Sequence, residues 1–403
     1  MAGSFQYRLR AERRPISVEG YRQAARRALP GMVWAYLDGS ADDNVTAGDN
    51  TGSFQRWRLR QRVLTGHARV QLASRMAGTG LAMPLALAPT GLTGLSHWSG
   101  DPACARAAEA AGTRLVLSTA SSYTLEEVAS ATEQNHWFQL YPFGDKPFVG
   151  GLLRRARDSG YTALFVTVDV PVRGNREGER ISGMTVPPTL TPASVLDAAL
   201  HPRWWWNLLR HRRLAAANYV SSGLRGAAAA VQSVRAQERF MQADLHWDDL
   251  AWMREQWKGP IYVKGLLDPD DAERAVDRIG VDGIVVSNHG GRQLDNVQAS
   301  VDALPAIAAR VGDRCEVLLD GGVRRGTDVI KALCLGARGV FIGRPYVYGL
   351  AADGEAGVRD VLAILRAEME RALVLMGCPS VAELDRGWLL PAPGCADHTR
   401  SEA

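Results

Sequence analysis

The feature that most constrains the fold is a series of eight short apolar runs separated by helical segments. The runs are Pro84–Pro89, Arg114–Ser118, Trp137–Tyr141, Ala163–Asp169, Pro260–Gly265, Gly283–Ser287, Glu316–Asp320 and Gly339–Gly343. They are rich in apolar or β-branched residues and hardly alternate with polar ones, which is typical of strands buried on both faces. Helical spacing covers 16–37, with a break at Pro30-Gly31, and also 102–112, 124–134, about 151–160, 269–280 and 301–312.

The number of repeats favours a closed sheet. Strands that alternate with helices run parallel, and eight such units predict an α/β fold of the TIM-barrel type, (β/α)8. An open doubly wound sheet is the alternative, but it would carry a GxGxxG motif after the first strand, and none is present. We expect a basic polar arm at 1–15, an N-terminal helical cap at 16–80, the barrel at 81–387 and a disordered tail at 388–403.

One interval is too long for a single helix and its loops. About ninety residues separate Asp169 from Pro260, which predicts an insertion after the fourth strand, at about 178–243. Its centre, His201–Arg213, reads HPRWWWNLLRHRR, with three consecutive tryptophans, four arginines and no acidic residue. These tryptophans could contact a membrane, cover the barrel or form a subunit contact.

Composition excludes several classes of protein. Of the 403 residues, 46% are hydrophobic and 22% charged, as in a soluble globular protein with a large core. The net charge of +4 gives no indication of nucleic-acid binding. Five cysteines without CxxC spacing predict neither a disulfide framework nor a metal site, and reduced thiols fit the cytosol. We find no secretory signal and no uncharged apolar stretch long enough to cross a bilayer.

Glycines and arginines follow the last two predicted strands. Asp320–Gly326 reads DGGVRRG, and Gly343–Pro345 reads GRP. Glycines let backbone N–H groups approach an anion, while Arg324 and Arg344 add forked donors. TIM barrels often bind phosphate at this place. Two successive loops of this kind favour an anion site over simple chain turns.

A histidine and an arginine follow the sixth strand in the motif SNHGGRQLD. His289 lies beside Gly290 and Gly291, which leave the imidazole uncrowded. A histidine with a pKa near neutrality suits a general base. Arg292, three residues later, suits a carboxylate substrate.

Further polar residues end other strands. Lys264 ends the fifth strand, where an unpaired ammonium is costly to bury, and it could form a Schiff base or stabilise negative charge on a cofactor. Asp169 could orient His289 and balance its charge. Arg176 with Arg292 would supply two cations for one small anion. The neighbouring strand ends add Gln139, Tyr141 and Thr167.

Together these motifs resemble those of the FMN-dependent 2-hydroxy-acid oxidases and dehydrogenases. SNHGGRQLD is highly specific for that family, and APTG, WFQLY, TVDVP, VKG and DGGVRRG stand in the family's order. The resemblance extends from about Val18 to Leu390. Within the family the chain is most similar to membrane-associated (S)-mandelate dehydrogenase and next to the L-lactate dehydrogenases, through YLDGSADDN, PTGLTG, LSTAS and LHPRWWW.

The resemblance implies a role for each residue. His289 would take a proton from the substrate, either the α-proton or the hydroxyl proton. Asp169 would support the resulting positive charge, and Lys264 would stabilise the negatively charged reduced flavin. The substrate would be bound by Arg176 and Arg292 at its carboxylate, with Tyr36 and Tyr141 at its oxygen atoms. FMN would be held by Pro89, Thr90, Gly91, Ser118, Gln139, Thr167, Lys264, Ser287, Asp320, Gly321, Gly322, Val323, Arg324, Gly343 and Arg344.

The implied reaction is oxidation of an (S)-2-hydroxy acid, mandelate-like or lactate, to the 2-oxo acid, with electrons passed to a quinone or another membrane acceptor. Ala120, where glycolate oxidases carry tryptophan, predicts a roomier pocket, and Gly91 favours a dehydrogenase that reacts poorly with oxygen. The alternatives are a peroxide-forming 2-hydroxy-acid oxidase, a Schiff-base barrel lyase or aldolase, and a non-catalytic membrane scaffold.

The implied acceptor gives the insertion a role. Tryptophan prefers the membrane interface and arginine prefers anionic headgroups. Residues 201–213 therefore predict peripheral attachment on the cytoplasmic side of the inner membrane. Because relatives are usually homotetramers, we also expect a homo-oligomer.

Overall fold

A closed parallel sheet forms the centre of the protein. The computed structural model describes residues 14–142, 144–185, 188–220, 226–240 and 244–393. The strands are β4 (Leu85–Leu87), β5 (Val116–Ser118), β6 (Trp137–Leu140), β7 (Leu164–Thr167), β8 (Ile261–Leu266), β9 (Gly283–Val286), β10 (Glu316–Leu319) and β11 (Gly339–Ile342). They pair in the order β4-β11-β10-β9-β8-β7-β6-β5, and a parallel bridge between Leu87 and Leu115 joins the two ends of the sheet. The predicted TIM barrel is thereby confirmed.

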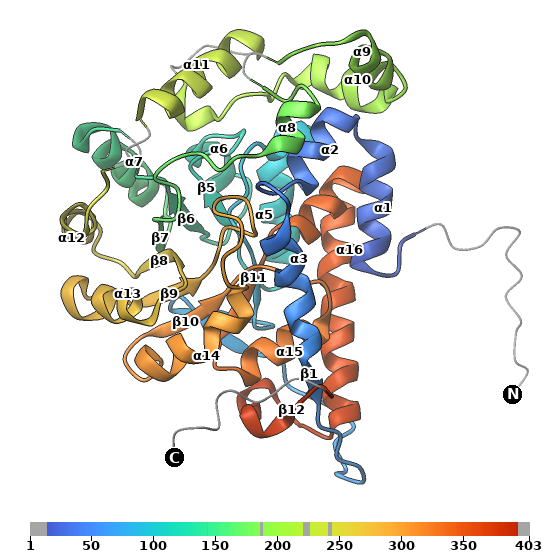
Figure 1. Ribbon diagram of the computed structural model, residues 1–403, viewed down its shortest axis with the longest axis vertical. Helices are drawn as coiled ribbons and strands as arrows, with labels where there is room; N and C mark the ends of the chain where they lie inside the picture. The colour runs from blue at the N-terminus through green and yellow to red at the C-terminus, as the bar shows by residue number, and fades with distance from the viewer. Residues whose placement is uncertain (1–13, 143, 186–187, 221–225, 241–243, 394–403) are drawn as a thin grey trace, which may run out of the picture.

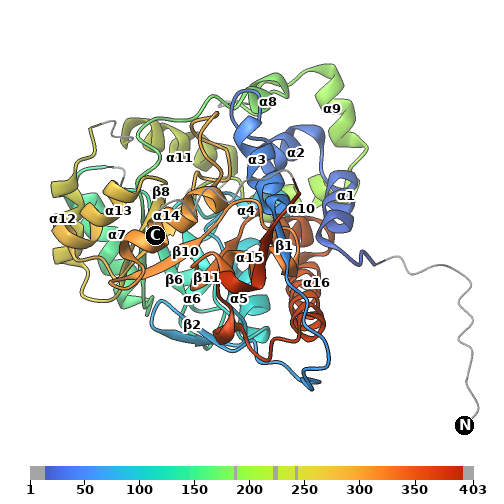
Figure 2. The ribbon, with the colours of Figure 1, turned by 60° about the horizontal axis from the view of Figure 1, so that its bottom comes forward.

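Helices surround these strands (Figure 2). They are α4 (Thr93–Ser96), α5 (Gly100–Ala110), α6 (Leu125–Ala129), α7 (Lys146–Asp158), α12 (Trp247–Gln256), α13 (Pro269–Arg274) continued by the π-helix η3 (Ala275–Ile279), α14 (Ser300–Val311), α15 (Gly326–Cys334) and α16 (Arg344–Met376). The prediction of one helix over 124–134 is wrong beyond Ala129. There the backbone N–H groups of Glu133 and Gln134 donate to the Glu109 carboxylate instead of continuing the helix.

The N-terminal region is only partly helical. It begins with α1 (Val18–Ala28), α2 (Gly31–Asp38), α3 (Val45–Gly52) and the 3-10 turn η1 (Ser53–Arg56), so the break at Pro30-Gly31 is confirmed. The helical-cap prediction is wrong for the later part, which forms β1 (Trp57–Leu59), β2 (Ser74–Met76) and β3 (Thr79–Leu81). The β2–β3 hairpin covers the start of the barrel strands, because the Met76 thioether fills the space beside Gly339.

The chain end also differs from expectation. After the 3-10 turns η4 (Val381–Glu383) and η5 (Arg386–Trp388), β12 (Leu389–Pro391) pairs antiparallel with β1. The prediction of disorder from residue 388 is therefore wrong at this point, since Trp388 and Leu389 are buried. Residues 394–403, like residues 1–13 of the predicted arm, lie outside the described residues.

The insertion follows β7, as predicted, and gathers at one end of the molecule (Figure 1). Its helices are α8 (Glu177–Ile181), α9 (Pro192–Ala199), α10 (Pro202–His211), the 3-10 turn η2 (Ala217–Tyr219) and α11 (Gly226–Phe240). The indole N–H of Trp204 donates to the Leu95 carbonyl oxygen at 2.7 Å and attaches α10 to the barrel. In contrast, Trp206 and Leu209 are each 59% exposed. Of the three tryptophans, Trp204 thus has a structural role, because it holds α10 against the barrel.

Aromatic rings fill the barrel interior below the rim. The Phe165 ring stacks on Tyr262 with centroids 4.7 Å apart and meets Phe341 edge-on at 5.5 Å. Trp137 packs against the same cluster from β6. Because every strand contributes its inward side chains to one small volume, these rings fix the strands relative to each other.

Truncation of this cluster should destabilise the whole barrel. We expect Phe165→Ala to lower the free energy of unfolding by about 3–5 kcal/mol, since the cavity has no neighbour free to fill it. Val374→Ala, at a largely exposed helical position, should change it by less than about 0.5 kcal/mol. Denaturant unfolding of both variants measures the difference, and equal midpoints would contradict this account of the core.

Candidate active site

A cavity of about 430 Å³ opens at the carboxyl ends of the strands. The predicted residues that line it are Tyr36, Pro89, Thr90, Gly91, Tyr141, Arg176, Lys264, His289, Arg292, Asp320, Gly321, Gly322, Val323, Arg324, Gly343 and Arg344. They come from α2, from β8 and from the segments after six other strands, so barrel closure brings distant parts of the sequence together. Ala120 also lines the cavity, as expected for a pocket without a bulky residue at that position.

Five predicted residues do not line this cavity, namely Ser118, Gln139, Thr167, Asp169 and Ser287, and the first three are bonded to one another. Ser118 donates to the Gln139 amide oxygen at 3.0 Å, and the Gln139 amide nitrogen donates to the Thr167 hydroxyl at 2.9 Å. All three side chains are buried. This chain of hydrogen bonds fixes the orientation of the Gln139 amide. It also keeps polar groups of three adjacent strands at one level beneath the rim.

His289 is held in place by an unusual backbone and by a carboxylate. Its φ of 58° lies in the left-handed region, as do those of Gly290 and Gly291, so three successive residues adopt this conformation. Nδ1 of His289 lies 2.9 Å from Asp169, and Nε2 lies 3.2 Å from the Tyr141 hydroxyl. Because an ionised carboxylate can only accept, Nδ1 carries the proton and Nε2 is the basic nitrogen.

The surroundings of the pair set its charge. Burial lowers the pKa of His289 below its ordinary value of 6.5, and Asp169 opposes this effect. Burial would raise the pKa of Asp169, but the contacts with His289 and the charge of Lys264 outweigh it and lower that pKa. At neutral pH the imidazole is therefore neutral and the carboxylate ionised, which is the protonation state that a general base requires.

Lys264 is a buried cation with fixed partners. Its Nζ lies 3.0 Å from Asp320 and donates to the Ser287 hydroxyl at 2.9 Å. Burial lowers the pKa of Lys264, but the charges of Asp320 and Asp169 raise this pKa by more than burial lowers it, so the net shift is upward. The following residue, Gly265, has φ of 110°, and a Cβ there would lie 2.5 Å from Cγ of Asp169. The glycine of the VKG motif thus lets the Asp169 side chain pack against the backbone directly after Lys264.

The two arginines of the expected anion receptor lie together at the cavity. Arg292 Nη1 donates to the carbonyl oxygens of Tyr36 and Gly39 at 2.8 and 2.7 Å. Arg176 Nε donates to the Arg292 carbonyl oxygen at 3.2 Å. Burial, followed by repulsion from Arg292, lowers the pKa of Arg176 to about 10, which still leaves it charged at neutral pH. The Arg292 guanidinium also lies over the Tyr36 ring, 5.2 Å from its centroid.

The glycine–arginine loops leave buried polar atoms facing the cavity. Arg344 donates to the carbonyl oxygens of Gly290 and Gly39 through its two terminal nitrogens. Its buried Nε and the buried Oδ1 of Asp320 have no hydrogen-bond partner among the described residues. A phosphate oxygen could accept a hydrogen bond from Nε of Arg344, and a hydroxyl group could donate one to Oδ1 of Asp320.

The backbone N–H groups just before α15 are already bonded within the protein. The Asp328 carboxylate already accepts from the backbone N–H groups of Arg324 and Arg325. An anion would therefore meet the glycines and the arginine side chains rather than the first turn of α15.

Sequence reasoning missed three polar residues around the arginines. Glu179 on α8 bonds to Arg176, Arg292 and Arg173, and Arg173 lines the cavity. Gln293 donates to the carbonyl oxygens of Asp169 and Val172 and thereby connects the loop after β9 to the segment that follows β7. The signal for Glu179 was its position three residues after Arg176, the spacing at which helical side chains meet.

Comparison with known proteins agrees with this geometry. Residues 25–391 match the FMN-dependent dehydrogenase family. The chain belongs to that family. L-lactate dehydrogenase of Caulobacter vibrioides (strain NA1000 / CB15N) is 44% identical over 369 residues, which cover 92% of this chain and 96% of the relative. (S)-mandelate dehydrogenase of Pseudomonas putida is 40% identical over 374 residues, or 93% of both chains.

A solved structure gives the same result for the fold. The crystal structure of the monotopic membrane protein (S)-mandelate dehydrogenase superposes with a TM-score of 0.90 at 39% identity, and covers 94% of this chain and 100% of that one. The chain is thus a flavoenzyme of the 2-hydroxy-acid dehydrogenase type, and FMN is its cofactor. The cavity fits FMN, because it combines two arginines in glycine-rich loops, a buried ammonium and the open acceptor of Asp320.

Replacement of Asp169 by Asn should have two effects on catalysis. The value of kcat should fall about 10²–10⁴-fold, because a protonated His289 loses its counter-charge. The acid limb of kcat/KM should move to lower pH. The wild-type limb lies below 6.5 since burial lowers the pKa of His289, and Asp169 raises that pKa. Without Asp169 the imidazole stays neutral to lower pH still.

Steady-state pH profiles measure both effects. Asp248→Asn, a change at an exposed carboxylate, is the control and should leave the profile unchanged. A limb that stays in place or moves to higher pH in Asp169→Asn would contradict the assignment.

Proposed function

We propose that this chain oxidises an (S)-2-hydroxy acid, mandelate-like or lactate, to the 2-oxo acid and passes the electrons to a quinone or another membrane acceptor. The observation that carries this proposal is His289, held by Asp169 beside a cavity that Arg176 and Arg292 also line. A base and an anion receptor in one pocket suit a substrate that carries an acidic group next to the reacting carbon.

Each residue would act at a stated atom. Arg176 and Arg292 would bind the carboxylate and fix the substrate's orientation. Nε2 of His289 would accept a proton from the carbon or its hydroxyl, while Asp169 balances the imidazolium. The Tyr141 hydroxyl, 3.2 Å from Nε2, would contact the substrate oxygen. Bound FMN supplies the two-electron acceptor, and the buried Lys264 ammonium would lie beside it and favour negative charge there.

The charge of Lys264 argues against a Schiff-base lyase or aldolase. Such chemistry needs a neutral amine, which enzymes obtain by lowering the pKa of the lysine. Here Asp320 and Asp169 raise the pKa of Lys264 despite its burial, so the nitrogen stays protonated. The ammonium is therefore better suited to stabilise negative charge than to attack a carbonyl.

A peroxide-forming oxidase would use the same pocket. Gly91 favours the proposed dehydrogenase. It lines the cavity beside Ala120, and a Cβ added to Gly91 would lie 3.1 Å from the Ala120 methyl group. The amount of peroxide formed per turnover would distinguish the two enzymes.

A membrane acceptor is supported by the surface of the insertion. Helices α9 and α10 expose a set of large apolar side chains, namely Val195, Leu196, Leu200, Trp206 and Leu209. Arg203, Arg210 and Arg212 lie on the same segment, and amphipathic helices with aromatic and basic residues bind membrane interfaces. Among the described residues, no helix combines the length and apolar character needed to cross a bilayer. Peripheral attachment through α9 and α10 on the cytoplasmic side is therefore our proposal.

Anaerobic bleaching of the flavin tests the chemistry. We expect (S)-mandelate or L-lactate, but not the (R) or D form, to bleach the bound flavin of the wild type. His289→Ala should retain FMN but bleach about 10²–10⁴-fold more slowly, because the base is lost. His246→Ala, at an exposed histidine outside the cavity, is the control and should bleach at the wild-type rate. A fully active His289→Ala would refute the assignment of the base.

Flotation with vesicles of phosphatidylcholine and phosphatidylglycerol tests the membrane contact. Trp206→Ser combined with Leu209→Ser should reduce the floated fraction several-fold, while Trp204 still attaches α10 to the barrel. The control is Val63→Ser combined with Leu64→Ser, which removes apolar side chains that are even more exposed from the loop after β1, at the opposite end of the molecule (Figure 1). Equal flotation of wild type and the α10 variant would end the proposal.

A further inference from the structure

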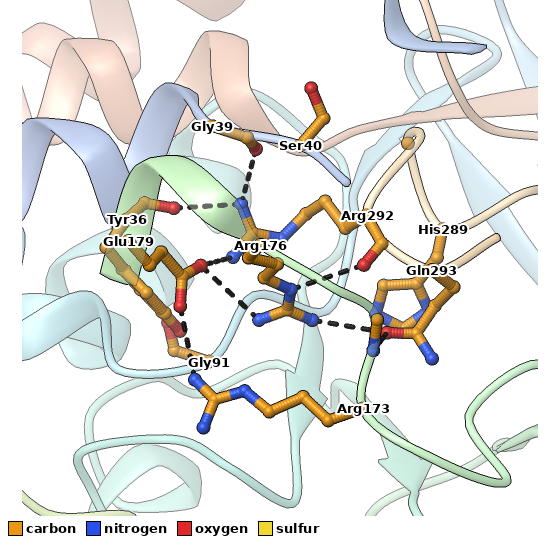
Figure 3. A network of polar contacts seen from close by, with 12 residues as sticks. Tyr36, Gly39, Ser40, Gly91, Arg173, Arg176, Glu179, His289, Arg292 and Gln293 are labelled. Atoms are coloured by element: carbon orange, nitrogen blue, oxygen red, sulfur yellow. Dashed lines mark hydrogen bonds and ion pairs between the residues drawn. The ribbon is translucent and has the colours of Figure 1, made fainter. Parts of the chain in front are cut away.

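A carboxylate lies at the centre of the arginine cluster, and the catalytic scheme above gives it no role. Glu179 extends from α8 of the insertion, and its side chain is only 3% exposed. Its Oε1 lies 3.0 Å from Nη2 of Arg292 and 3.5 Å from Nη1 of Arg176, and its Oε2 lies 3.1 Å from Nη2 of Arg173 (Figure 3). A single buried acid thus bridges three arginines.

The bonds on the other edges of the arginines come from uncharged groups. Arg292 donates to the carbonyl oxygens of Tyr36 and Gly39. Arg176 donates to the Arg292 carbonyl oxygen and, at 3.3 Å, to the Gln293 side-chain oxygen. Neutral carbonyls therefore orient one side of each guanidinium. The bridge from Glu179 is the contact that holds the two guanidiniums in register with each other.

Glu179 is also the negative charge in a cluster of cations. Burial lowers the pKa of Arg176 and of Arg292, and a neighbouring cation adds to this effect, Arg292 for Arg176 and Arg344 for Arg292. The charge of Glu179 opposes the shift on both arginines. Two buried guanidiniums without a counter-charge would repel each other and draw in water. With Glu179 they can remain close together before any substrate arrives.

The bridge leaves the substrate side of the cluster open. In Figure 3 Glu179 lies on one side of Arg176, and His289 lies on the other. At Arg176 the acid therefore lies on the side away from the base. An anion that approaches His289 can meet Arg176 without replacing Glu179.

We propose that Glu179 is a positioning residue that aligns Arg176 and Arg292 as one preformed receptor for the substrate carboxylate. This inference rests on the proposed function, because it assumes that the two arginines bind the substrate's acid group. It gives the insertion a catalytic contribution beyond membrane contact, since α8 belongs to it. Preorganisation of this kind lowers the cost of binding and of reaching the reactive geometry.

A purely electrostatic role and a positioning role of Glu179 predict opposite effects of Glu179→Gln on the affinity for a carboxylate ligand, which makes the inference testable. If Glu179 acted only through its charge, its loss would make the pocket more positive, and a carboxylate ligand would bind more tightly. If Glu179 positions the arginines, the same ligand binds more weakly. Coulomb attraction and alignment thus differ in the sign of the change in Kd, not merely in its size.

The experiment compares FMN-loaded wild type, Glu179→Gln and Glu179→Asp. Binding of benzoylformate and pyruvate is followed through the flavin spectrum, and kcat and KM are measured with (S)-mandelate and L-lactate. We expect Glu179→Gln to raise the Kd and KM about ten- to hundredfold, with a smaller fall in kcat, and Glu179→Asp to restore part of the affinity. Glu126→Gln removes another carboxylate paired with an arginine, Arg155 on the outer surface, and should change none of these values.

The outcomes separate this inference from the proposed function. Wild-type enzyme that no 2-hydroxy acid bleaches would defeat the proposed function itself. Wild-type bleaching with unchanged or tighter anion binding in Glu179→Gln would overturn only the role of Glu179. If Glu179→Gln fails to retain FMN, Glu179→Asp decides, because it keeps the charge and shortens the reach. Weaker binding in Glu179→Asp supports positioning, and wild-type affinity refutes it.

Discussion

The closure of eight parallel strands is the constraint on which the rest of this structure depends. Because all strands run in one direction around a ring, their carboxyl ends meet on a single rim, and residues more than two hundred positions apart share one cavity. The aromatic cluster of Trp137, Phe165, Tyr262 and Phe341 fixes the strands below that rim. Rigid strands allow a strained residue such as His289, with its positive φ, to persist at the site.

Charge compensation is the second principle of the site. Each buried cation of the rim has a defined partner: Lys264 has Asp320, Arg292 and Arg176 have Glu179, and Arg344 has backbone carbonyls. The one titratable base, His289, is kept neutral by burial although Asp169 lies against it. The site can thus combine cations for an anionic substrate with a base that is free to accept a proton. Without these partners, burial alone would lower the pKa of the cations and favour their neutral forms.

The sequence was informative where residues act at strand ends, and uninformative where they act through the insertion. Lys264 and Asp169 lie at the ends of apolar runs, and His289 and Arg292 follow the run that ends at Ser287 within a few residues, so barrel topology places all four near the rim. Glu179 lies in a helix whose packing against α2 depends on the folded insertion. Its spacing from Arg176 indicates that one contact, but no local pattern reveals that Arg292 meets the same carboxylate. The chain end was misjudged for a similar reason. Leu389–Pro391 becomes ordered only by pairing with β1, over three hundred residues earlier.

The most direct test of the central claim is a crystal structure of the FMN-bound enzyme with a 2-oxo acid product. The account predicts the product carboxylate between Arg176 and Arg292, with the C2 oxygen within hydrogen-bond distance of the Tyr141 hydroxyl and of Nε2 of His289. The flavin phosphate should lie beside Arg324 and Arg344. A product bound outside this cavity, or with its carboxylate away from both arginines and its C2 away from His289, would contradict the account.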